Sequence, residues 1–101
     1  MKKKFAFLLI GEHYDPAVHH AVFDTQRQVT LIVTVKNYQE ARQKVLELQE
    51  QGVGAIELCG GFGPDRAREL GELTGHQVAI GFVTHHRDQD DLFQSFFTNF
   101  G

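Results

Sequence analysis

The chain has 101 residues, a formal net charge of −3 with its six histidines neutral, and one cysteine. This length fits a single domain over residues 1–101 with a core that needs no crosslink, the charge argues against nucleic acid as a partner, and one cysteine excludes an intrachain disulfide. Because no apolar run approaches the roughly 20 residues of a membrane span, we expect no membrane partner. A single cysteine suits a reducing compartment, so we expect a cytoplasmic protein.

The first element expected is a buried strand over residues 5–10, where six consecutive residues are apolar. Gly11 ends this strand. Asp15 and Pro16 then have the pattern of a helix N-cap and first helical position. Because small apolar residues follow at helical spacing, the pattern predicts a short helix over residues 16–23.

The rest of the chain alternates between strands and helices. Residues 29–35 are rich in β-branched side chains and predict the clearest strand. Asn37 and Glu40 form a capping box that opens a helix reaching about residue 51. A strand over 53–59, a helix opened by Pro64 and a strand over 78–83 follow, and acidic residues 88–91 begin a last helix.

This order predicts an α/β fold with a four-stranded, mostly parallel sheet built from βα units. Such units form either half of a (β/α) barrel or a small doubly wound sheet. If residues 12–27 are only a loop, the alternative is a ferredoxin-like α+β sandwich. A sheet this small exposes its edges, and pairing between chains is a common remedy, so we expect a homo-oligomer such as a dimer.

Parallel strands would bring several functional groups to one edge, because ligands bind beyond the carboxyl ends of such strands. The glycine-rich turn over residues 60–63 exposes backbone N–H groups at the start of a helix, which suits a small anionic or phosphate-bearing ligand. The expected ligand contacts are Gly60, Gly61, Phe62, Gly63, His13 and Lys36. The alternative is that the glycines serve only the sterics of a tight turn.

The same edge offers candidate catalytic residues. Cys59 could act as a nucleophile with His85 as its base, or it could pack as a small hydrophobe. Glu57 lies among apolar residues and is a candidate acid or base, with a structural pairing to Lys36 as the alternative. Whether the protein is an enzyme therefore stays open.

The sequence assigns no metal and identifies no cofactor; the alternative left open is a metal ion held by Glu12, His13 and one of His85 and His86. His85 and His86 are adjacent, so on a regular strand they point to opposite faces and cannot both bind one ion. The histidine spacings of common zinc motifs are absent from the sequence.

The last helix has a broad apolar face, formed by Leu92, Phe93, Phe96, Phe97 and Phe100. Such a face either covers the chain's own sheet or is buried in a second copy. The second possibility predicts a non-enzymatic module that assembles through this helix.

The stretch "GAIELCGGFGP" resembles the signature of a family of short, uncharacterised bacterial α/β proteins, a domain of unknown function. The matching positions are Glu57, Cys59, Gly60, Gly61, Phe62, Gly63 and Pro64. The resemblance extends from the first strand to about Val83. It implies an α/β fold but carries over no substrate and no catalytic residue. More distantly, the turn is similar to phosphate-binding strand ends of (β/α) barrels, which is an analogy of architecture only.

Overall fold

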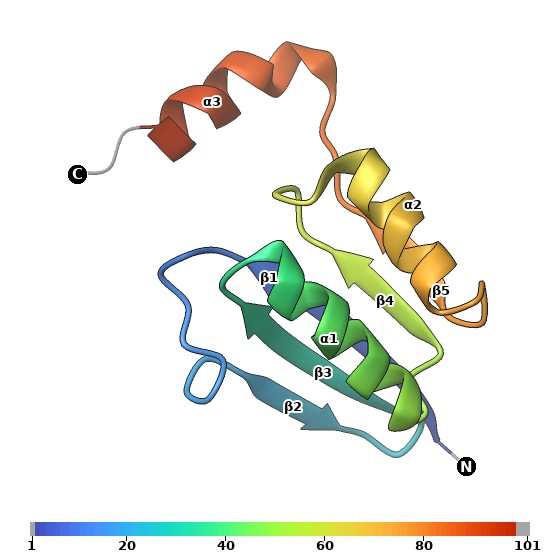
Figure 1. Ribbon diagram of the computed structural model, residues 1–101. Helices are drawn as coiled ribbons and strands as arrows, with labels where there is room; N and C mark the ends of the chain where they lie inside the picture. Colours follow the sequence, from blue (N-terminus) through green and yellow to red (C-terminus); the bar gives the residue numbers. More distant parts are fainter. Residues whose placement is uncertain (1, 99–101) are drawn as a thin grey trace.

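The protein is described by a computed structural model that covers residues 2–98. Its centre is one five-stranded sheet with the strand order β2-β3-β1-β4-β5 (Figure 1). The strands are β1 (Lys3–Ile10), β2 (Ala21–Asp24), β3 (Gln28–Val35), β4 (Ala55–Leu58) and β5 (Ala79–Phe82). All neighbouring pairs are parallel except β2 and β3, so the predicted mostly parallel α/β sheet is confirmed.

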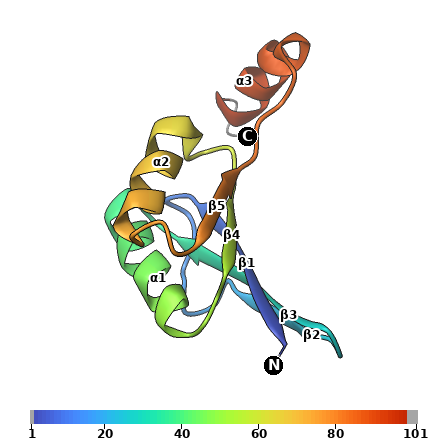
Figure 2. The ribbon, with the colours of Figure 1, turned by 90° about the vertical axis from the view of Figure 1, so that its right-hand side faces the viewer.

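Helices α1 (Tyr38–Glu50) and α2 (Gly63–Leu73) cover the same face of this sheet (Figure 2). Strand topology explains why. From β3 to β4 and on to β5, the chain moves across the sheet in one direction. Right-handed crossovers in one direction place each connecting helix on the same side. The other face receives no helix from these connections.

The prediction of four strands is wrong, and neither finer architecture is confirmed. A (β/α) barrel has its strands in sequential order, whereas β1 here lies between β3 and β4. A doubly wound sheet has helices on both faces, whereas α1 and α2 share one face. The ferredoxin-like alternative does not match a sheet in which four strands run the same way.

The extra strand, β2, occupies part of the segment predicted as a helix over residues 16–23. Asp15 does cap a turn, since its carboxylate accepts the N–H of Ala17 at 3.1 Å and its carbonyl accepts the N–H of Val18 at 3.0 Å. The helix stops after that one turn because its apolar residues, such as exposed Val18, meet no core. The chain instead pairs with β3 as an antiparallel edge strand.

The hydrophobic core lies between the sheet and the two helices. Leu8 of β1, Val45 of α1, Leu58 of β4 and Leu70 of α2 are fully buried there. Each such side chain contributes roughly 1.5–3 kcal/mol to stability relative to an exposed one. The capping box also forms, because Asn37 Oδ1 accepts the Glu40 N–H at 2.9 Å, while Glu40 Oε1 accepts the N–H of Lys36, one residue before the cap, at 2.8 Å.

The opposite face, which we call the open face, consists of the alternate side chains that point away from α1 and α2. Phe5 and Phe7 of β1 belong to it, paired in register with Thr30 and Ile32 of β3. Phe23 of β2 lies beside Thr30 and is 59% exposed. The loop before β2 covers one end of this face, where Thr34 Oγ1 donates to the His19 carbonyl at 2.8 Å.

Helix α3 (Asp90–Thr98) stands beyond the carboxyl ends of the strands and packs mainly against the adjacent 3-10 helix η1 (Arg87–Gln89) (Figures 1 and 2). The predicted last helix is therefore confirmed, but it does not cover its own sheet. Phe100 lies outside the described residues. None of the helices within residues 2–98 is long and apolar enough to cross a membrane.

Candidate functional site

The carboxyl ends of the four parallel strands lie at one edge of the sheet, as predicted. Backbone hydrogen bonds continue the ladder past the strand ends: Gly11 N–H donates to Val35 O at 3.0 Å, and Cys59 N–H donates to Leu8 O at 3.0 Å. The segments that carry His13, Lys36 and the glycine turn therefore leave the sheet at the same edge. Their side chains do not all turn toward a common point.

Cys59 is half-buried against β1. Its Sγ accepts the Ile10 N–H at 3.4 Å, and its side chain packs at the border of the hydrophobic core. These contacts suit the alternative of a small packed hydrophobe.

His13 and His85, the two histidines predicted at this edge, contact residues other than Cys59. His85 Nε2 is 2.7 Å from Asp90 Oδ1, and the His85 ring stacks on Phe93 with centroids 4.1 Å apart. The His13 ring lies against the Tyr14 ring, with centroids 4.3 Å apart and the ring planes tilted by 36°. Neither contact brings an imidazole to the Cys59 thiol, so the geometry adds nothing to the hypothesis of a nucleophile with its base.

Steric requirements account for two of the three glycines in the turn. Gly63 has a φ of +79°, a conformation that L side chains rarely adopt. A Cβ on Gly61 would lie 3.0 Å from Ile10 Cγ2, so this position needs close packing. Phe62 is buried in the core. Gly60 and Lys36 are exposed at the edge and remain predicted ligand contacts.

Glu57 lies on the open face, in register between Phe7 of β1 and Gly81 of β5. Its carboxylate covers Gly81, where an added Cβ would sit 2.7 Å from Glu57 Oε2. The pairing with Lys36 assumed that β3 and β4 are neighbours. That assumption is wrong, because β1 separates them.

A polar cluster that sequence patterns did not indicate joins α1 to α2. The Tyr38 hydroxyl donates a hydrogen bond to Glu69 Oε1 at 2.7 Å, and the Arg66 guanidinium carbon lies 4.7 Å from the centroid of the Tyr38 ring. Burial, followed by the hydrogen bond to Glu69, raises the pKa of Tyr38 above its usual value. Arg66 and Glu69 are neighbours on α2, whereas Tyr38 lies about thirty residues earlier on α1, so only the packing of the two helices brings the three residues together.

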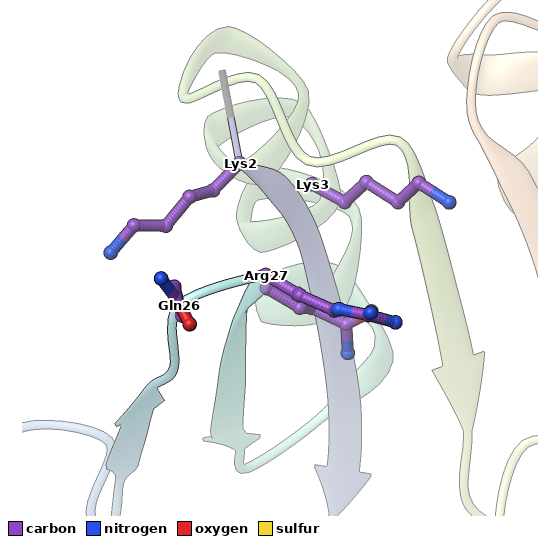
Figure 3. Close-up of a pocket in the computed structure, with 5 residues that line it drawn as sticks. Lys2, Lys3, Gln26 and Arg27 are labelled. Carbon is purple, nitrogen blue, oxygen red and sulfur yellow. The ribbon is translucent and has the colours of Figure 1, made fainter.

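A basic hollow of about 750 Å³ opens at the amino ends of β1 and β3, at the opposite end of the strands from the glycine turn (Figure 3). Its lining residues are Lys2, Lys3, Gln26, Arg27 and Gln28. Lys3 and Arg27 extend in one direction in Figure 3, whereas Lys2 extends in the other and pairs with Asp24 at 2.6 Å. A second hollow, of about 480 Å³, lies between α2 and β5.

Within residues 2–98, no three histidine, cysteine, aspartate or glutamate side chains gather closely enough to hold a metal ion.

A family model matches residues 3–98, and the chain belongs to this family, a family of unknown function (DUF6506). The match extends past Val83, where the resemblance in the sequence ended, and includes α3. Searches of curated proteins and of solved structures found no match.

The glycine turn allows a direct test of its structural role. We expect Gly63→Ala to lower the free energy of unfolding by about 1 kcal/mol, because alanine is strained at positive φ. Gly60→Ala is the matched control, since its Cβ would lie at an ordinary contact distance of 3.7 Å from Val83 O. Urea unfolding of both variants measures the difference, and equal losses would contradict this interpretation of the turn.

Proposed function

We propose that the protein is a non-enzymatic module that assembles with itself, and that α3 is the element that mediates assembly. The observation that carries this proposal is the exposure of four large apolar side chains on one short helix. Leu92 is 66% exposed, Phe93 43%, Phe96 74% and Phe97 63%.

A helix of this kind is not expected to be stable in water without a surface to pack against. It has nine residues, whereas isolated helices shorter than about 12–15 residues are marginal even with favourable sequences. Acidic residues Asp90 and Asp91 in its first turn and the stacking of His85 on Phe93 support its start. Its apolar face needs a partner, and residues 83–86 hold it away from its own core.

The area available is sufficient for a stable dimer. The exposed parts of the three phenylalanines and Leu92 amount to on the order of 400 Å². Covering them removes a comparable area from the partner surface. Two reciprocal contacts in a symmetric dimer would therefore bury roughly 1,600 Å², the standard size of a specific interface.

Sedimentation velocity over a range of concentrations tests this proposal. We expect the wild-type chain to form a dimer, and we expect Phe96→Asp to give a folded monomer, because a charge at the centre of an apolar contact is costly to bury. Gln94→Asp is the matched control, since it adds the same charge to the polar side of α3. A monomeric wild type, or a Phe96→Asp chain that still dimerises, would contradict the proposal.

A second candidate function is the binding of a small anionic ligand at the turn over residues 60–63. It is supported by two features. The turn lies at the carboxyl edge of parallel strands, and the N-cap residue of α2, Phe62, provides no side-chain hydrogen bond to the first turn of the helix. Backbone N–H groups there are available to an anion.

We propose the cytoplasm as the location of the protein, since a single cysteine suits a reducing compartment.

Titration with inorganic phosphate, followed by amide NMR shifts, tests the second candidate. Binding at the turn predicts saturable shifts at Gly60, Gly61 and Asp65 that Lys36→Ala weakens several-fold. Shifts that appear instead at Lys3 and Arg27, or an absence of saturable shifts, would count against this site.

A further inference from the structure

We infer that α3 of one copy docks on the open face of a second copy, with the acidic end of the helix over the cationic end of that face. This inference rests on the proposed self-assembly and specifies its geometry. It commits to one occupant of the open face, a second copy of this chain.

The open face is apolar in its middle and cationic at one end. Phe5, Phe7 and Ile32 occupy the middle, on adjacent strands β1 and β3. Lys3 shares the outward direction of Phe5 and Phe7, because side chains on a strand alternate. Its register partner, Gln28, hydrogen bonds Thr30 on the same face at 2.9 Å, and Arg27 extends in the same direction as Lys3 (Figure 3).

Helix α3 has the complementary pattern along its length. Asp88 precedes the helix, Asp90 is its first residue, and the phenylalanines follow. Helical spacing within α3 places Asp90 in line with Phe93 and Phe97. Asp88 lies just before α3, in the 3-10 helix η1, four residues ahead of Leu92. Asp91 instead aligns with Gln94, Ser95 and Thr98 on the polar side. Acidic and apolar groups therefore follow one another on α3 in the same order as cationic and apolar groups on the open face.

The lengths also agree. Nine helical residues span about 13 Å, and the apolar middle of the face, from Phe5 to Leu9, spans about the same distance along β1. Because Lys3 is at the amino end of β1, the docked helix runs parallel to β1 with its acidic end at Lys3.

A second copy supplies this match more readily than the chain itself. In one chain, α3 stands beyond the carboxyl ends of the strands, whereas Lys3 and Arg27 lie at their amino ends (Figures 1 and 2). Two copies whose strands run in opposite directions bring each acidic helix end to the cationic end of the other copy. The exchange is then reciprocal, as two-fold symmetry requires.

Glu57 fits this placement of the helix. It lies on the β4 side of β1, beside Gly81, and is the acidic group of the open face within this region. A helix docked over β1, β3 and β2 covers Phe7, Ile32 and Phe23 and leaves the Glu57 carboxylate in water. No charge then has to be buried without a partner.

Charge-reversal variants measured by sedimentation at low salt test the inference. We expect Lys3→Glu and Asp88→Lys each to weaken the dimer about five- to thirty-fold, because each contact occurs twice. Combining both changes should restore affinity to within about threefold of wild type. Lys4→Glu and Asp91→Lys are matched controls on the opposite sides of β1 and α3, and each should change affinity less than about twofold.

The outcomes separate the two proposals. A wild-type dimer that neither reversal weakens, or whose double variant is no tighter than the singles, overturns this docking geometry and leaves self-assembly intact. A wild type that is monomeric overturns self-assembly, and the docking with it. Circular dichroism of each variant shows whether it folds, and rescue by the double variant identifies the contact even if a single variant is destabilised.

Discussion

The central constraint on this molecule is the handedness of its strand connections. Because β3, β4 and β5 follow one another in one direction across the sheet, right-handed crossovers place α1 and α2 on the same face. The first connection, from β1 to β2, contains only a turn and a loop, so it adds no helix to the other face. A mostly parallel sheet normally has both faces covered. Here the chain supplies one layer, and the apolar side chains of the open face have to find another.

That constraint links the two surfaces that lack a partner within the chain. The phenylalanines of α3 are exposed, and Phe5, Phe7 and Ile32 on the open face are half-buried among their strand neighbours, so both surfaces leave apolar area in contact with water. Joining them across two copies covers both surfaces at once. Thr34, near the carboxyl end of β3, is instead buried by the loop before β2. The chain itself therefore covers the end of the open face that lies toward the glycine turn. Assembly and any ligand binding at the glycine turn would therefore use different parts of the molecule.

Local chemistry explains which predictions from the sequence are confirmed. The capping box at Asn37 and the β-branched run of β3 act within a few residues, so their positions are evident in the sequence. Asp15 and Pro16 predict a helix over residues 16–23, but only one turn forms there. Whether a turn extends into a helix depends on a core to pack against, and exposed residues such as Val18 have none beside them. Strand order likewise depends on distant pairing, which is why a link from Glu57 to Lys36 was expected although β1 intervenes. The edge shared by Cys59 and His13 followed from strand direction, whereas the turning of His85 toward Phe93 followed from the position of α3.

Isotope-filtered NMR of a mixed dimer tests the central claim most directly. One copy carries ¹³C-labelled isoleucine methyl groups, and the other is unlabelled. If α3 of one copy contacts the open face of the other, magnetisation passes between the two copies. We then expect intermolecular cross-peaks from the aromatic protons of Phe96 and Phe97 to the Ile32 methyl groups. Ile56 is an internal control because it is buried under the helices on the opposite face, and it should show none. A dimer whose Ile32 methyls show no contact with the aromatic rings of the other copy would contradict the claim.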